Sequence, residues 1–170
     1  MKNAKGFTLV ELIIYIGILS VMVVGLVSFA LSMTSARTKT YTNQNVQANA
    51  RMTLDIIMQK IRTAQSVNIG VSVFGIDPGV LSLQMADPLK NPTIINLSAN
   101  DGRLQITEGV GVPIYLTDNE TEVSNLLFTN LTQSGEREHI KIDLMVRYVN
   151  AASVDYSYSW SGSSAASVRQ

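Results

Sequence analysis

The sequence predicts an α+β protein in which a long N-terminal helix packs on an antiparallel β-meander. Three observations lead to this fold class. An apolar run begins at Phe7, an amphipathic helical pattern follows it, and after Gly70 the hydrophobic period changes from that of a helix to that of a strand. Because the strands all come after the helix, the plan is a segregated one rather than an alternation of strands and helices.

The bulk composition excludes several classes of function. The chain has 170 residues, enough for one domain and one further element. Charged residues make up 15% of it, and between Phe7 and Ala36 the ionisable side chains are Glu11 and Tyr15. The formal net charge is zero, which gives no indication of a nucleic-acid partner. There is no cysteine, so a disulfide, a thiolate metal site and a Cys nucleophile are excluded.

The apolar run over residues 7–33 predicts a membrane helix that stays with the protein. About 20 apolar residues suffice to cross a bilayer as a helix, and no proline interrupts this run. A secretory signal peptide would be shorter and would carry a small-residue cleavage site behind its apolar core. We therefore expect processing ahead of the run, after Gly6, with residues 1–6 as a leader and residues 7–36 as the membrane-spanning helix.

The helical pattern continues beyond the apolar run as an amphipathic outer helix, predicted over residues 37–69. Its apolar positions fall on one stripe of a helix. They are Val46, Ala50, Leu54, Ile57, Met58 and Ile61. No glycine or proline falls between Leu26 and Ile69, and Gly70 is a reasonable C-terminal stop. At 1.5 Å per residue, a helix over residues 7–66 would be about 90 Å long.

Short segments rich in β-branched residues, separated by turn signals, predict the β domain over residues 70–170. The predicted strands cover residues 71–74, 80–85, 93–97, 103–107, 122–129, 140–148 and 154–160. Asn100-Asp101-Gly102 fits a tight hairpin between the third and fourth of these strands. Residues 161–170 are rich in serine and alanine, and we expect them to form a flexible C-terminal tail.

One heptapeptide carries a more specific signal. Lys5-Gly6-Phe7-Thr8-Leu9-Val10-Glu11 resembles the type IV prepilin signature, a short basic leader that ends in Gly and is followed by Phe, three mainly apolar residues and Glu. The resemblance covers the leader and the helix behind it. It implies that a prepilin peptidase cuts after Gly6 from the cytoplasmic face and that the new N-terminus, Phe7, is N-methylated. A long helix whose outer half packs on a β-meander is also what it implies.

Glu11 is the most informative single residue, because a carboxylate inside an apolar helix costs about 2.5–3.5 kcal/mol on insertion scales. A simpler interpretation is that Glu11 lies near the cytoplasmic membrane–water interface and its carboxylate reaches water. The resemblance implies instead that Glu11 of one subunit pairs with the α-ammonium of Phe7 on a neighbour and sets the register of the fibre. Two such charges attract strongly in a low-dielectric bundle.

Several features favour a minor pilin or pseudopilin over a bulk fibre subunit. The cysteine pair of many major pilins is missing, and Ser28 stands where many of them have a helix-kinking proline. Residues 50–64 and 123–128 resemble the J-type minor pseudopilins and the W-type minor pilins. Retention of Glu11 argues against the tip pseudopilin that characteristically lacks this glutamate.

The resemblance therefore implies a non-enzymatic subunit of a type IV pilus, a competence pilus or a type II secretion pseudopilus. Its partners would be other pilin or pseudopilin subunits, a prepilin peptidase, membrane lipid before assembly, and an inner-membrane platform with a separate ATPase. No cofactor and no direct nucleic-acid partner are expected. The localisation would be single-pass in the inner membrane with an extracytoplasmic C-terminal domain, and then in the filament. The rival hypothesis is a monomeric, membrane-anchored receptor or ligand-binding module with an uncut N-terminus.

The remaining candidate residues favour structural roles. His139 is the sole histidine, and we expect it at the surface rather than in a metal site. The acidic residues within 118–122 could hold a calcium ion weakly, but a solvated loop is the preferred interpretation. Tyr156, Tyr158 and Trp160 fit the inward face of a strand better than a binding face. No catalytic constellation or nucleotide motif is present.

Overall fold

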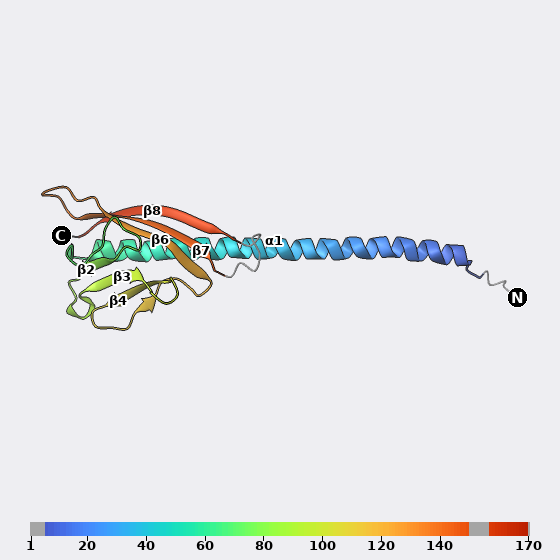
Figure 1. The fold of residues 1–170 in the computed structure, drawn as a ribbon, viewed down its shortest axis with the longest axis horizontal. Coiled ribbons are helices and arrows are strands. Elements are labelled where there is room, and N and C mark those ends of the chain that lie inside the picture. Colours follow the sequence, from blue (N-terminus) through green and yellow to red (C-terminus); the bar gives the residue numbers. More distant parts are fainter. Residues whose placement is uncertain (1–5, 150–156, 170) are drawn as a thin grey trace. The chain divides into compact units, whose positions relative to one another are not determined.

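The computed structural model describes residues 6–149 and 157–169, and within them it contains one long helix and eight strands (Figure 1). The elements are α1 (Leu9–Thr63), β1 (Ser66–Val67), β2 (Leu81–Gln84), the 3-10 helix η1 (Pro88–Lys90), β3 (Thr93–Leu97), β4 (Leu104–Glu108), β5 (Ile114–Tyr115), β6 (Thr121–Asn130), β7 (His139–Tyr148) and β8 (Ser159–Ser167). The predicted α+β fold class is confirmed, since the long N-terminal helix packs on antiparallel sheets. The chain forms two compact units, Met1–Thr40 and Tyr41–Gln170, and α1 contributes to both.

In the first unit, the helix has apolar side chains on every side and none of them is buried. Its large apolar side chains, from Phe7 to Met33, are between 50% and 76% exposed. A helix that is apolar all round is stable only in apolar surroundings. Within the described residues, α1 is the helix whose length and composition would allow it to cross a membrane.

Hydroxyl groups within this apolar segment bond to the helix itself. Ser20 Oγ donates to the carbonyl of Ile16 at 2.7 Å, and Ser32 Oγ donates to the carbonyl of Ser28 at 3.0 Å. A hydroxyl satisfied in this way needs no water, so it is tolerated in lipid or between packed helices.

In the second unit, the predicted apolar stripe of the outer helix forms the centre of the core, as the sequence pattern indicated. Its six members are at most 8% exposed. They are Val46, Ala50, Leu54, Ile57, Met58 and Ile61. They pack in one cluster with the inward side chains of both sheets, so burial of this stripe holds residues 41–63 against the β domain.

The helix ends earlier than predicted, at Thr63 rather than at residue 69 before Gly70. The amide of Gln65 donates to the carbonyl of Gln84 at 2.8 Å, and the next two residues form β1 against β2. No local signal marks this end, because there is no glycine or proline between Thr63 and Gly70. Pairing with a strand that comes later in the chain overrides local helix propensity here.

The first sheet is an antiparallel meander in the order β1-β2-β3-β4-β5. Its three central strands were predicted, and β3 and β4 form the predicted hairpin from Thr93↔Glu108 to Leu97↔Leu104. The Ser98 amide donates to the Arg103 carbonyl at 2.8 Å, so the connection is a short turn over residues 99–102 that contains the predicted Asn100-Asp101-Gly102. The strand predicted over residues 71–74 is reduced to the single bridge Val73↔Val80, and β5 was not predicted.

The second sheet has the order β6-β7-β8, so the β domain contains two sheets rather than one continuous meander. Strands β6 and β7 coincide with the predicted strands, with a bulge between Val123 and Asn125. The predicted flexible tail over residues 161–170 is wrong up to Ser167, because these residues pair with β7 as β8. Of the strand predicted over residues 154–160, residues 154–156 lie outside the described part of the chain, as do residues 1–5 of the predicted leader.

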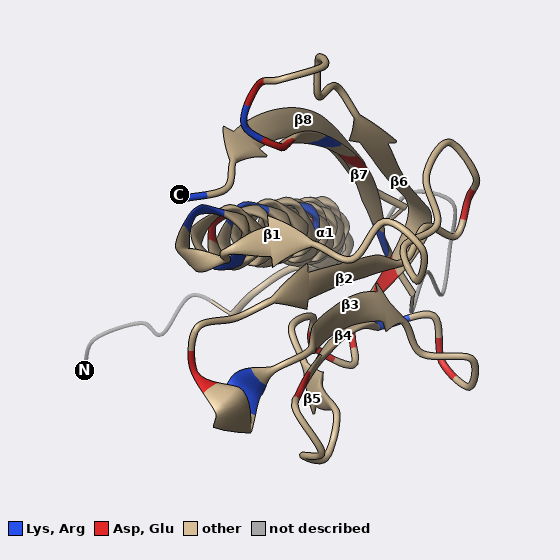
Figure 2. Cartoon of the chain, turned by 90° about the vertical axis from the view of Figure 1, so that its left-hand side faces the viewer, with Lys and Arg blue, Asp and Glu red and all other residues tan. Residues whose placement is uncertain are grey.

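Within the second unit, the helical segment lies between the two sheets, as the end-on view shows (Figure 2). One inward face comes from β2, β3 and β4 and the other from β6, β7 and β8. Phe128, the largest fully buried side chain, belongs to β6. The glycine at position 79 leaves room for it, because a Cβ there would lie 2.9 Å from the Phe128 ring.

Candidate functional site

The N-terminus of α1 is closed by a reciprocal pair of hydrogen bonds between Thr8 and Glu11. The amide of Glu11 donates to Thr8 Oγ1 at 3.3 Å, and the amide of Thr8 donates to Glu11 Oε2 at 3.4 Å. The amide of Leu12 donates to the Thr8 carbonyl at 3.1 Å, which starts the helical hydrogen-bond pattern. This is a capping box, in which a threonine and a glutamate three residues apart each satisfy one orphan amide.

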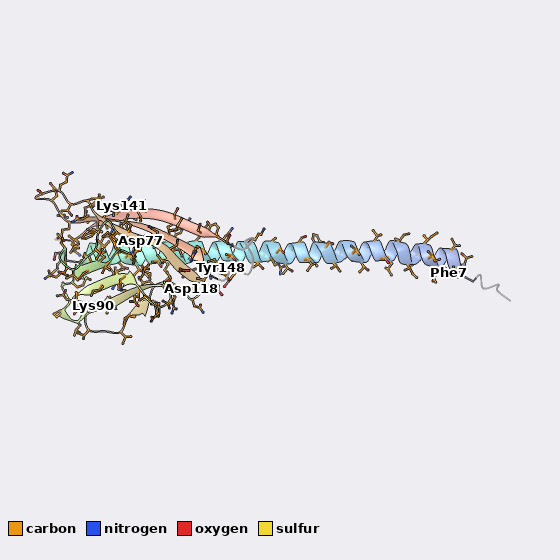
Figure 3. The ribbon with its side chains drawn as sticks, viewed as in Figure 1. Phe7, Asp77, Lys90, Asp118, Lys141 and Tyr148 are labelled. Carbon is orange, nitrogen blue, oxygen red and sulfur yellow. The ribbon has the colours of Figure 1, made fainter. Side chains whose placement is uncertain are left out.

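The predicted processing residues lie just outside this cap. Gly6 and Phe7 precede the helix and are exposed, and the Phe7 side chain is 76% exposed (Figure 3). The peptide bond between them is therefore not held in helical hydrogen bonding. Sequence reasoning missed Thr8, although the Thr-x-x-Glu spacing was the signal that could have identified it.

Within the described part of the chain, the carboxylate of Glu11 bonds to the Thr8 amide alone. Among the described residues, no lysine or arginine forms an ion pair with it. A negative charge in the first turn of a helix is favoured by the helix dipole, by about 0.3–1 kcal/mol at an exposed site. Among the described residues, the other carboxylate oxygen, Oε1, accepts no hydrogen bond, so it can accept one from another group.

A second cluster of polar residues lies at the start of the helical segment of the second unit. Asp118 Oδ2 accepts from Asn49 Nδ2 at 2.9 Å, and Glu120 Oε2 accepts from Asn45 Nδ2 at 3.1 Å. Tyr41 also donates to Glu120 Oε2, at 3.3 Å. The solvated loop predicted here is therefore only partly correct, because its carboxylates anchor the helix.

Burial in this cluster also affects a tyrosine. The pKa of Tyr148 is raised, first by burial and then by the negative charges of Glu120 and Asp118. The other oxygen of Asp118, Oδ1, accepts from the Glu120 amide at 3.1 Å and from Thr121 Oγ1 at 2.8 Å. These carboxylates are engaged by protein donors, and no group of three metal-ligating side chains occurs among the described residues.

The remaining candidates take structural positions. His139 Nδ1 lies 2.8 Å from Ser167 Oγ, across the β7–β8 pair. The phenol of Tyr158 accepts from Gln47 Nε2 at 2.8 Å, and Trp160 packs partly buried against the core. Tyr156 lies outside the described residues. Tyr158 and Trp160 thus support the interpretation as an inward strand face.

The molecule therefore combines an exposed apolar helix with a capped, acidic first turn and a β domain. Residues 1–27 match the family model of the prokaryotic N-terminal methylation motif. The chain thus carries a type IV pilin-like prepilin signature. Neither the curated proteins nor the solved structures gave a match.

Proposed function

We propose that the protein is a structural subunit, a minor pilin or pseudopilin, of a type IV pilus, a competence pilus or a type II secretion pseudopilus. The observation that carries this proposal is that the methylation motif over residues 1–27 coincides with the first part of α1, in which the large apolar side chains up to Met33 are all exposed. A single copy of the chain offers these side chains no apolar partner. Lipid before assembly, and the same helices of other subunits after it, would supply one.

The proposed processing uses the exposed segment ahead of the helix. A prepilin peptidase would hydrolyse the peptide bond between Gly6 and Phe7, which releases the leader and leaves an α-ammonium group on Phe7. N-methylation of that amine would preserve its positive charge. The capping box begins one residue later, at Thr8, so the cut would leave the helix and its cap intact.

The proposed assembly contact pairs Glu11 of one subunit with the ammonium of Phe7 on a neighbour. Both charges would lie in a bundle of apolar helices, where an unpaired charge is costly and a paired one is specific. Because Glu11 Oε2 serves the cap, Oε1 is available for this contact. Membrane anchoring, a cytoplasmic leader and a separate assembly ATPase belong to the same proposal.

The proposed subtype, a minor pilin or pseudopilin, rests on features of the sequence. The lack of cysteine, the serine at position 28 and the residues near 50–64 and 123–128 favour a minor pilin or pseudopilin. The polar side chains of the N-terminal cap and of the cluster around Asp118 and Glu120 bond to one another and to α1, which is consistent with a structural role.

N-terminal sequencing and intact-mass measurement of the protein from native membranes test the proposal. We expect a chain that starts at N-methylated Phe7. A chain that still begins at Met1, in cells with an active prepilin peptidase, would contradict the proposal and favour an anchored receptor with an uncut N-terminus.

A further inference from the structure

The two sheets end in four edge strands, β1, β5, β6 and β8. An edge strand presents unpaired amides and carbonyls that can pair with another chain, and proteins usually shorten, cover or charge such edges. The protection of these four edges is unequal.

Two of the edges are short. Strand β1 has two residues, and its outward amide, that of Val67, donates to the carboxylate of Glu138. Strand β5 also has two residues, and Pro113 immediately before it has no amide hydrogen to offer. Neither edge offers a run of free donors and acceptors.

The edge of β6 is long but covered by residues 75–79. The amide of Gly79 donates to the Leu126 carbonyl at 2.8 Å, and the amide of Gly75 donates to the Phe128 carbonyl at 2.9 Å. Asp77, labelled in Figure 3, accepts from the Leu126 amide at 2.8 Å. The outward groups of the middle of β6 are thus satisfied within the chain.

The edge of β8 is different, and its hydrogen-bond parity shows which groups point outward. The Tyr148 amide donates to the Tyr158 carbonyl, and the Val168 amide donates to the Glu138 carbonyl, both at 3.0 Å. Since hydrogen-bonded and non-bonded pairs alternate in an antiparallel ladder, even-numbered residues of β8 bond to β7. Odd-numbered residues direct their amides and carbonyls away from the sheet.

These outward groups have no hydrogen-bond partner in the described part of the chain. Among the described residues, none forms a hydrogen bond with the outward amides or carbonyls of Ser161, Ser163 and Ala165, and all three residues are exposed. The strand has nine residues, SWSGSSAAS, with no charge and no proline. Among the described residues no segment covers this edge, and the strand has neither the shortness nor the proline that limits the other edges.

We propose that the outward edge of β8 is an assembly surface, which accepts an extended segment of a neighbouring pilin-like subunit as a further strand. This proposal rests on the proposed function, because the filament supplies the neighbour. Main-chain hydrogen bonds would provide the affinity, as in other cases of strand addition. The small, neutral side chains of β8 impose neither a charge nor a bulky group on the incoming strand.

The direction of β8 selects this occupant over a second β8. Gln47 Nε2 donates to the Tyr158 phenol near the start of β8, whereas the Arg169 amide donates to the Ala64 carbonyl near its end, at 3.2 Å. Strand β8 thus runs in the same direction as residues 47–64. Antiparallel pairing of two β8 edges about a two-fold axis would reverse these helical segments, whereas subunits of one filament share one polarity.

Hydrogen–deuterium exchange of the full chain, in detergent and in sheared filaments, tests the edge directly. We expect the amides of Ser161, Ser163 and Ala165 to exchange fast in the solubilised subunit and slowly in filaments. The amides of the intervening residues, Gly162 and Ser164, should be protected in both states. Equal, fast exchange of the outward amides in both states would overturn the proposal.

A charged variant gives an independent test. Ser163→Lys should reduce incorporation into filaments about tenfold, equivalent to about 1.4 kcal/mol, because lysine blocks strand addition. Its matched control is Ser124→Lys, which changes an exposed serine on the covered β6 edge. Unchanged thermal unfolding of both variants would show that the fold is intact, and equal incorporation of both would contradict the proposal.

The identity of the neighbour can be read from photo-cross-linking at position 163, with position 124 as control. A cross-linked peptide from another subunit supports the proposal, whereas a β8–β8 cross-link in detergent would overturn the choice of occupant. If the chain starts at Phe7 and assembles into filaments in which the β8 edge stays unpaired, the proposed role of β8 is wrong but the proposed function stands. An uncut chain that does not assemble would overturn the proposed function as well.

Discussion

The two halves of α1 have the same backbone structure but opposite surroundings. Residues 9–40 carry large apolar side chains on all sides, and those up to Met33 are at least half exposed. Residues 41–63 concentrate their apolar side chains on one stripe, which the two sheets bury. The pattern of apolar residues around a helix thus indicates what surrounds it. Apolar residues on one stripe indicate packing against the rest of a domain, whereas apolar residues on all sides indicate lipid or several neighbouring helices.

The polar residues differ in the same way. In the first half, Glu11 is the acidic residue, and its carboxylate bonds to Thr8 at the first turn. In the second half, Asn45 and Asn49 bond to carboxylates of the β domain more than 60 residues away in sequence. The proposed assembly contact would use the carboxylate of the first half with a partner outside the chain, whereas the second half uses its polar groups within the chain. The following changes test this difference.

Removal of the Glu11 charge should have the largest effect on assembly, and it should leave membrane insertion unchanged. We expect Glu11→Ala to insert into the membrane normally but to fall at least about tenfold in a sheared filament fraction, the equivalent of about 1.4 kcal/mol. Glu11→Gln should behave in the same way, because it keeps a capping side chain but not the charge. Thr8→Ala, which removes the cap and keeps the charge, is the matched control. Equal amounts of wild-type and Glu11→Ala protein in filaments would contradict the charge-pairing role.

Shortening a buried side chain of the second half should destabilise the β domain. Ile57→Ala should lower the free energy of unfolding by about 2–5 kcal/mol, because Ile57 is fully buried and leaves a cavity. Ile13→Ala, the same change at a position 61% exposed in the first half, should leave this free energy unchanged. Urea titration of the full chains in detergent, monitored by Trp160 fluorescence, measures both. Similar losses for the two variants would refute the division of α1 into two environments.

The polar anchors of the second half should have an intermediate effect. Asp118→Ala removes the acceptor that joins the Asn49 side-chain amide to the β domain and the acceptor of the Thr121 hydroxyl, so we expect a loss of about 1–3 kcal/mol. The control is Asn43→Ala, at an exposed position of the same helix, which should stay within about 0.5 kcal/mol of wild type. If Asp118→Ala proves neutral in the same titration, the cluster does not anchor the helix.

The smallest effect is expected far from the helix, at Asp101. A hydrogen bond from the Ser98 side chain, and then contacts with Arg103, hold the pKa of Asp101 below its ordinary value of 3.8. Because the folded pKa is the lower one, the stabilisation is present above pH 3.8 and is lost as the pH falls through the folded pKa. Asp101→Asn should therefore reduce slightly the difference in melting temperature between pH 7 and pH 3. An unchanged difference would show that this carboxylate does not contribute.

Much of this molecule could be predicted because its signals are local. The stripe from Val46 to Ile61 repeats with the helical period, and β2, β3, β4, β6 and β7 are rich in β-branched or apolar residues bounded by turn signals. The heptapeptide around Gly6 and Phe7 is also a local signal, so it can be recognised without tertiary information. Even the unnoticed cap at Thr8 follows from the Thr-x-x-Glu spacing.

The features that could not be predicted depend on contacts between distant residues. The serine-rich sequence of β8 has little strand propensity of its own, and it forms a strand because β7 offers a full row of partners from His139 to Arg147. The end of α1 at Thr63 depends in the same way on β2, which comes much later in the chain.

By itself, the sequence determined the apolar helix, its acidic first turn, the amphipathic continuation and most of the strands, because residue spacing within a few turns decides these features. Only the tertiary structure decided that the strands divide into two sheets and that Asp118 and Glu120 bind α1. It also decided that three edges are short or covered, whereas no described segment covers the edge of β8. Edge protection is a relation between a strand and whatever lies beside it. Only in the folded chain do Asp77 and Glu138 accept hydrogen bonds from the edge amides of β6 and β1, and only there does β8 become an edge strand.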